Sequence, residues 1–367
     1  MKYLKEEWQL AAILVTAGLF RVFGAAWLAD LSGAGWFALV SLWLLLAMFM
    51  SACAVVRHAE ALAVKLGEPY GTLILTLAIT GIEVIMIAAI MYTGKGNATL
   101  ARDAMMAVVM IVLNGMVGLC LVLGGLRYRE QAYNLQGANA FLAVILPLAV
   151  LGLVQPNFTV TTPGPVYSPT QAAFLSLMSV VLYAVFLGMQ TSRYREYFMS
   201  PDASTRDNQS GAPGHPVRSI PYHAVMLLVY IAPFVLLSKQ IGVPINHAIR
   251  VLHAPPELAG VLVSVLVLSP ESLSAVRAAL ANQLQRSVNL LLGSVLASIG
   301  LTIPAVLAVG FATGHEIILG LGATDMTLLV LTLVLSTLTF AAQRTNVLLG
   351  AVHLLVFFAY LLFIFER

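Results

Sequence analysis

Charged residues are scarce in this chain of 367 residues. Asp, Glu, Lys and Arg together make up 10% of it and 60% is apolar, whereas about a quarter of a soluble domain is charged. Apolar runs of about 20 residues, long enough to cross roughly 30 Å of hydrocarbon, recur along the whole sequence. The composition excludes an ordinary soluble domain and predicts an all-α polytopic membrane protein.

Three further absences limit the function. The two cysteines, Cys53 and Cys120, both fall in apolar runs and have the spacing of neither a zinc site nor a loop disulfide. The net charge of +3 is spread through short loops, with no basic stripe for nucleic acid. No His-Glu-x-x-His motif is present, which leaves an intramembrane enzyme as a remote alternative. We therefore expect no enzyme, no resident cofactor and no nucleic-acid partner.

The apolar runs predict about eleven transmembrane helices. Their expected ranges are 8–28, 35–56, 70–93, 104–126, 138–154, 170–191, 221–238, 257–277, 288–311, 325–342 and 346–365. The first run is longer than the apolar part of a typical signal peptide and Arg21 interrupts it, which favours a retained helix. The stretch from Ser192 to Ser219 is the only long polar segment and is typical of a flexible linker.

The positive charges predict the orientation of these helices. With the N-terminus inside, thirteen of the 19 Lys and Arg residues fall on the inner side and five on the outer side, while Arg21 lies within the first run. Short cytoplasmic loops carry the excess of Lys and Arg. We expect a multi-pass protein with its N-terminus and central linker in the cytoplasm and its C-terminus outside.

The linker divides the remaining helices into two sets of five. The predicted organisation is an N-terminal transmembrane helix (1–33), a first five-helix repeat (34–191), a cytoplasmic linker (192–220) and a second five-helix repeat (221–367). Because five is odd, the second set is inverted relative to the first, as in many secondary transporters. In such folds the binding site lies near the middle of the membrane, where the repeats meet.

Two acidic residues lie inside apolar runs, although the chain has 16 in all. Glu83 is in the second helix of the first set and Glu271 is in the second helix of the other set. A carboxylate in hydrocarbon is costly unless it is protonated or paired. The matching positions make both glutamates candidate functional-site residues.

Polar and helix-weakening residues accompany both acids. On an ideal helix Thr76 and Thr80 lie on the same face as Glu83, although membrane threonines often bond only to their own helix. Gly81 precedes Glu83, and Ser269-Pro270 precedes Glu271; because proline lacks an N–H, Pro270 leaves a backbone carbonyl that a cation could use.

The helix that follows each acid carries small or amide side chains, of which Asn114 and Ser294 are the strongest candidate ligands. Close helix packing is an equally good explanation for any one of them. His353, alone in the last apolar run, is either a packed, hydrogen-bonded residue or, less favourably, part of a proton relay.

Two stretches carry a family resemblance. Gly71-Thr72-Leu73-Ile74-Leu75-Thr76-Leu77-Ala78-Ile79-Thr80-Gly81-Ile82-Glu83-Val84, and the sequence from Ser269-Pro270-Glu271-Ser272 through to Gly293-Ser294-Val295, resemble the α-repeats of the cation/calcium exchanger superfamily. With Arg344-Thr345-Asn346-Val347-Leu348-Leu349-Gly350 near the end, the chain is most similar to its bacterial calcium/proton antiporters. This similarity implies that the protein lies in the bacterial cytoplasmic (inner) membrane.

The resemblance implies eleven helices, with ten of them in two inverted repeats, and exchange of a cation for protons with Glu83 and Glu271 as central ligands. Many calcium/proton exchangers carry Gly-Asn four and three residues before each glutamate, where this chain has Ile79-Thr80 and Val267-Leu268. Ca²⁺ is the expected cation, and Na⁺ and K⁺ remain open. A cation channel without proton coupling is the alternative function. The expected partners are membrane lipid, the transported cations and protons; the sequence leaves the oligomeric state open.

Overall fold

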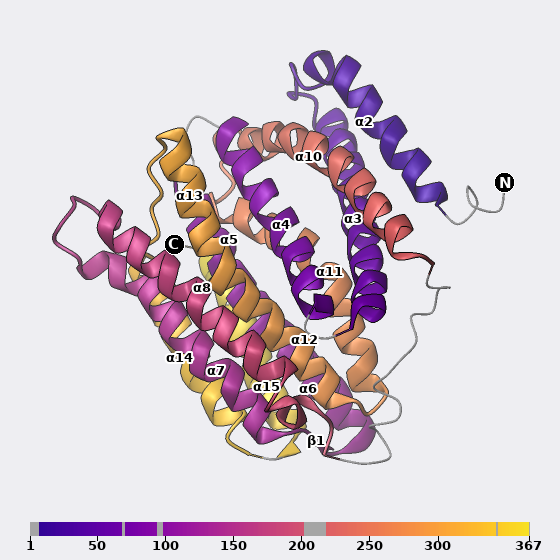
Figure 1. The fold of residues 1–367 in the computed structure, drawn as a ribbon. Helices are drawn as coiled ribbons and strands as arrows, with labels where there is room; N and C mark the ends of the chain where they lie inside the picture. Colours follow the sequence, from indigo (N-terminus) through magenta and orange to yellow (C-terminus); the bar gives the residue numbers. More distant parts are fainter. Residues whose placement is uncertain (1–6, 68–69, 94–97, 202–217, 343, 367) are drawn as a thin grey trace. The chain divides into compact units, whose positions relative to one another are not determined.

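The computed structural model describes residues 7–67, 70–93, 98–201, 218–342 and 344–366. These residues form a nearly all-helical protein (Figure 1). Ten of the described helical segments are long and apolar enough to cross a membrane, and a shorter apolar helix, Ala323–Thr339, is the eleventh. The predicted fold class of about eleven transmembrane helices is confirmed.

The elements follow the predicted order. They are α2 (Trp8–Trp27), α3 (Ala34–Leu66), α4 (Tyr70–Thr93), α5 (Leu100–Val109), η1 (Met110–Met116), α6 (Val117–Tyr128), β1 (Gln131–Ala132), α7 (Leu135–Ala149), η2 (Val150–Val154), η3 (Gln155–Phe158), α8 (Pro169–Thr191), η4 (Arg195–Phe198), α10 (Ile220–Arg250), α11 (Glu257–Leu280), α12 (Leu284–Ala297), η5 (Ser298–Thr302), α13 (Ile303–Thr313), α14 (Ala323–Thr339), β2 (Arg344–Thr345) and α15 (Val347–Phe365). Of the predicted linker, residues 202–217 lie outside the described residues.

Two helices extend well beyond the predicted spans. α3 continues ten residues past the predicted end at residue 56, and α10 continues twelve residues past residue 238. The apolar runs stop at Arg57 and Lys239, but a charged side chain ends only the apolar stretch, because Lys and Arg are good helix formers. Hydropathy therefore predicted the membrane crossing and not the length of the helix.

Three segments adopt π-helical geometry: η1, η2 and η5. η1 lies in the helix that follows the Glu83 helix, and η5 lies in the helix that follows the Glu271 helix. π-Segments are rare and frequently occur at functional sites. η1 and η5 thus occupy corresponding places after the two glutamate helices, whereas η2 has no π-helical counterpart in the described helix α14.

The chain forms two compact units, each drawn from both halves of the sequence. Unit 1 combines residues 1–100 with 213–270, and unit 2 combines 101–212 with 271–367. In unit 1, α3 packs against α4 and α10, and α2 lies against α3 and α10 (Figure 1). In unit 2, α15 packs on α6 and η1, α12 on α7, and α13 on α8. The division into sequence repeats remains a prediction.

Large apolar side chains cover the outside of the helices. Each of the following lies on a different helix and is more than half exposed: Val22, Leu46, Val185, Leu338 and Leu348. Soluble proteins rarely expose apolar surface on this scale. Lipid is the solvent that suits such a surface, since helices satisfy their own backbone hydrogen bonds.

Glycines allow α6 and α15 to cross at close range. A Cβ atom built on Gly118 would lie 2.9 Å from the carbonyl oxygen of Gly350, and one built on Gly350 would lie 2.8 Å from that of Gly118. Neither position has room for a side chain without backbone movement. The contact is of the small-residue type that brings membrane helices together.

We expect Gly118→Ala to lower the free energy of unfolding by about 1–3 kcal/mol, since the added methyl group overpacks this crossing. Gly188→Ala is the matched control, because no described atom lies within 4 Å of a Cβ at Gly188. Thermal unfolding in detergent would measure both variants. Equal melting temperatures for the two would contradict the close crossing.

Candidate cation site

Glu83 lies in the apolar helix α4 of unit 1. Its side chain is 1% exposed, and its neighbours Ile82, Met86 and Ile87 are fully or nearly fully buried. Thr80, less than one turn earlier, is also buried, and its hydroxyl oxygen has no hydrogen-bond partner among the described residues. Because buried hydroxyls are normally hydrogen-bonded, Thr80 offers an oxygen ligand close to Glu83 in the sequence.

The other predicted residues of α4 are less buried. Thr76 and Gly81 are partly exposed, and a Cβ built on Gly81 would meet no described atom within 4 Å. Close packing among the described residues therefore does not require a glycine at this position. The ligand roles of Thr76 and Gly81 remain predictions.

Glu271 lies in α11, directly after Pro270. Both side chains are partly exposed, and the helix continues through the proline without a break. The hydroxyl of Ser269 donates to the carbonyl oxygen of Val265 on its own helix. This is the helix-internal bonding expected of membrane Ser and Thr. The hydroxyl proton of Ser269 is thereby used, and its oxygen lone pairs remain able to bind a cation.

Side chains of unit 2 hold the C-terminal end of α11. Gln131 Nε2 donates to the carbonyl oxygen of Ala279 at 2.9 Å and to Asn282 Oδ1 at 3.1 Å, and Tyr128 Oη donates to the carbonyl oxygen of Leu280 at 2.8 Å. The last carbonyls of a helix lack partners within the helix. The C-terminal end of α11 is therefore fixed to the α6–β1 segment.

Hydroxyl groups follow one another along α12 and η5. Ser294, Ser298 and Thr302 are all buried and four residues apart, which places them on one helical face. The hydroxyl oxygens of Ser294 and Thr302 have no hydrogen-bond partner among the described residues. Thr302 was not predicted as a ligand, although the four-residue spacing of the hydroxyls in the sequence could have indicated it.

Asn114, in η1, is fully engaged in a buried network. Its Nδ2 donates to Thr332 Oγ1 at 2.7 Å, and its Oδ1 lies 3.1 Å from His353 Nδ1. His353 Nε2 in turn lies 2.9 Å from Thr339 Oγ1. The network links η1, α14 and α15, and it supports the interpretation of His353 as a packed, hydrogen-bonded residue.

The donors in these regions are oxygens. Within the described ranges no group of three or more His, Cys, Asp and Glu side chains gathers as a metal cluster. Carboxylates, hydroxyls and backbone carbonyls suit hard cations such as Ca²⁺, Na⁺ and K⁺. Glu83 belongs to unit 1 and Glu271 to unit 2, and their binding of one ion together remains a prediction from the sequence.

Comparison with known proteins gives consistent results. The family model described as sodium/calcium exchanger protein matches residues 36–192 and 222–366. The chain is 45% identical over 311 residues to the putative ionic transporter y4hA of Sinorhizobium fredii, covering 84% of each protein. It is 40% identical over 327 residues to the sodium-potassium/proton antiporter ChaA of Escherichia coli, covering 89% of this chain and 88% of that one.

A solved structure described as the Ca²⁺/H⁺ antiporter protein YfkE has the same fold, with a TM-score of 0.73 at 16% identity, covering 98% of this chain and 99% of that one. The resemblance to cation/calcium exchangers predicted from the sequence is thereby confirmed. Since the family model matches most of the chain, both halves and both glutamates included, this protein belongs to the sodium/calcium exchanger protein family.

Proposed function

We propose that this protein is a secondary active antiporter that exchanges a cation for protons. The observation that carries the proposal is the buried carboxyl group of Glu83, 1% exposed in an apolar helix beside the buried hydroxyl of Thr80. Membership of the exchanger family and similarity to a sodium-potassium/proton antiporter support it. These relatives favour exchange over the alternative of a channel.

The chemistry of a buried carboxylate explains the coupling. Burial disfavours its charged form, so a proton or a cation must neutralise it. We propose that the protonated and the cation-loaded forms change sides of the membrane and that the bare dianion of Glu83 and Glu271 does not. One Ca²⁺ would match two carboxylates and displace about two protons.

The identity of the cation follows from the same donors. We expect Ca²⁺ because two carboxylates match its charge, with Thr80 and Ser294 hydroxyls and water completing an oxygen shell. Na⁺ and K⁺ are the competing ions, because the relative that is 40% identical is described as a sodium-potassium/proton antiporter. A monovalent ion would displace only one proton from the pair.

The positive charges of the loops support an orientation with the N-terminus in the cytoplasm, in the cytoplasmic membrane of a bacterium. In this orientation the transmembrane proton gradient would drive cation extrusion from the cell. Everted membrane vesicles would expose the cytoplasmic face to the buffer.

The function is tested in everted vesicles that carry the native chain and have been energised by respiration. Ca²⁺, Na⁺ and K⁺ are added separately, and an internal pH dye reports proton release. We expect rapid internal alkalinisation with at least one cation and none in vesicles without the protein. Uptake of the cation with no linked pH change would contradict antiport and would favour the channel.

A further inference from the structure

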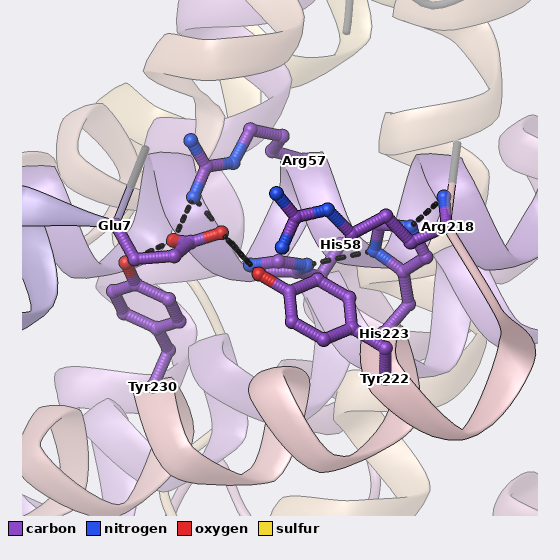
Figure 2. Close-up of polar contacts among 7 residues, drawn as sticks. All are labelled: Glu7, Arg57, His58, Arg218, Tyr222, His223 and Tyr230. Carbon is purple, nitrogen blue, oxygen red and sulfur yellow. Dashed lines mark hydrogen bonds and ion pairs between the residues drawn. The ribbon is translucent and has the colours of Figure 1, made fainter. Parts of the chain in front are cut away.

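A second group of charged and titratable side chains lies in unit 1, at the N-terminal end of α2 (Figure 2). Glu7, just before α2, accepts hydrogen bonds from Arg57 Nη2 at 2.5 Å, Tyr230 Oη at 2.7 Å and Tyr222 Oη at 3.0 Å. Arg57 belongs to α3 and both tyrosines belong to α10. One carboxylate therefore attaches the start of α2 to two other helices.

Two histidines extend this group, which we call the N-terminal cluster: Glu7, Arg57, His58, Arg218, Tyr222, His223 and Tyr230. His58 Nδ1 lies 2.9 Å from His223 Nδ1, and His58 Nε2 lies 3.5 Å from Glu7 Oε1. The backbone N–H of Arg218 donates to His223 Nε2 at 3.0 Å. Both histidines are buried, with exposures of 1% and 6%.

The hydrogen bonds determine the protonation of both rings. A backbone N–H can only donate, so His223 Nε2 is an acceptor and the proton of this neutral ring is on Nδ1. His223 Nδ1–H then donates to His58 Nδ1, and the proton of His58 is on Nε2, facing Glu7. Arg57 Nη2 also lies 3.4 Å from His58 Nε2, but both atoms carry protons in this arrangement and Arg57 donates to Glu7 at the shorter distance of 2.5 Å. The geometry thus describes two neutral imidazoles in a single directed series of hydrogen bonds from Arg218 to Glu7.

A proton added to this series of hydrogen bonds breaks at least one of them. A proton on His58 Nδ1 would reverse the bond between the rings and force the proton of His223 onto Nε2, against the N–H of Arg218. A second proton would place two imidazolium groups at 2.9 Å from one another. The surrounding charge also opposes protonation, because Arg57 and Arg218 outnumber the one carboxylate, Glu7.

Other titratable groups occur on the helices packed around the pair. They are Arg21 of α2, Glu60 and Lys65 of α3, Tyr70 and Glu83 of α4, and Lys239, His247 and Arg250 of α10.

Glu7 itself does not titrate in the range of histidine. Burial raises the pKa of its carboxyl, but the hydrogen bonds from Tyr230 and Tyr222 and the charge of Arg57 outweigh this and hold the pKa below 4.5. Its contribution to attachment is present above that pH and is lost only as the pH falls through the lowered value.

The opposite end of α2 is attached differently. Trp36 Nε1 donates to the carbonyl oxygen of Trp27 at 2.9 Å, and the rings of Phe20, Trp27 and Trp43 pack on one another. These aromatic contacts contain no group that titrates between pH 5 and 8. At this end the aromatic rings that join α2 to α3 therefore carry no such group themselves, although His247 of α10 packs on Phe37 of α3 nearby.

We propose that His58 and His223 form a proton-binding site, separate from the transport glutamates, and that proton binding there releases the N-terminal end of α2 from α3 and α10. At neutral and alkaline pH the chain of hydrogen bonds is intact and α2 is attached. At acid pH the chain breaks and this end of α2 moves away, while its aromatic end stays in place. Because α4, which carries Glu83, packs on α3 and α10, the site would connect pH to the helices around a transport residue.

Distance measurements between spin labels test the release. One label pair is placed at Ala11→Cys on α2 and Val225→Cys on α10, both exposed positions, and a second pair at Val22→Cys and Val243→Cys reports the aromatic end. Cys53 is replaced by Ala, and the buried Cys120 is retained. The purified full chain is compared at about pH 8 and about pH 4.5. The lower pH lies well below the ordinary pKa of histidine, because the surroundings of the pair oppose protonation.

We expect the first distance to shift to longer and broader values at the lower pH, and the second to stay constant. The shift should be lost in the double variant His58→Gln/His223→Gln and retained in His315→Gln, which alters an exposed histidine of unit 2. A native chain with the same first distance at both pH values would overturn the proposal even if the double variant fails to fold, and so would a shift that persists in a folded double variant. The measurement requires no transport, and its failure is distinguishable from failure of the antiport function.

Discussion

Replacing either membrane glutamate, Glu83→Gln or Glu271→Gln, is expected to abolish cation-linked proton movement. The amide keeps the size of the side chain but loses the negative charge that binds the cation and the group that binds the proton. Loss of an outer partner of a metal ligand already costs about 10–100-fold in affinity, and loss of a charged ligand should cost at least about 100-fold. Exchange should therefore fall below detection at cation concentrations that saturate the native chain.

The comparison needs a control for the substitution itself. Glu257→Gln makes the same chemical change in α11, the helix of Glu271, but at its first residue, and should leave exchange intact. Thermal unfolding in detergent would show that all three variants are folded, since a neutral amide is no harder to bury than a carboxylate. Full exchange in Glu83→Gln or Glu271→Gln would remove that residue from the site, and full exchange in both would defeat the antiport mechanism.

The sequence predicted the membrane-crossing helices well because hydropathy reports a local property, the cost of burying each residue in lipid. The N-terminal cap of α15 is equally local: the side chain of Asn346 accepts the backbone N–H of Leu349 at 3.1 Å. Both features depend on residues close together in the chain. The length of α3 beyond Arg57 was missed because hydropathy falls at the first charged residue, whereas the helix continues through residues that are good helix formers.

Long-range pairing explains the other differences. The N-terminal cluster joins Glu7 with residues 50 to 223 positions away, and no spacing rule connects them. The π-segments were not predicted either, since Met110–Met116 and Ser298–Thr302 have no distinctive composition. For the site residues, the sequence indicated which polar groups enter the membrane. Only the structure shows that Asn114 is hydrogen-bonded to His353 and Thr332. Only the structure shows that the hydroxyl of Ser294 has no partner among the described residues.

That contrast leads to a paired prediction for Asn114→Ala and Ser294→Ala. Removing the amide of Asn114 leaves Thr332 and His353 each short of a buried partner, so we expect the free energy of unfolding to fall by about 1–3 kcal/mol or more. Removing the hydroxyl of Ser294 breaks no hydrogen bond of the described protein, and we expect a change within about 0.5 kcal/mol. Thermal unfolding of the two variants in the same detergent measures this difference.

The two variants should rank in the opposite order for cation affinity: Ser294→Ala should weaken it and Asn114→Ala should not. If Ser294 supplies an oxygen to the ion, Ser294→Ala raises the KM for the cation in the vesicle assay, whereas Asn114→Ala lowers the amount of folded protein with little effect on the KM. Asn114→Asp extends the test, because its carboxylate still accepts from His353 Nδ1 but cannot donate to Thr332 as the amide does. A raised KM in Asn114→Ala with unchanged stability would show that the amide moves from the network to the ion during transport, and would restore Asn114 to the ligands that the sequence predicted.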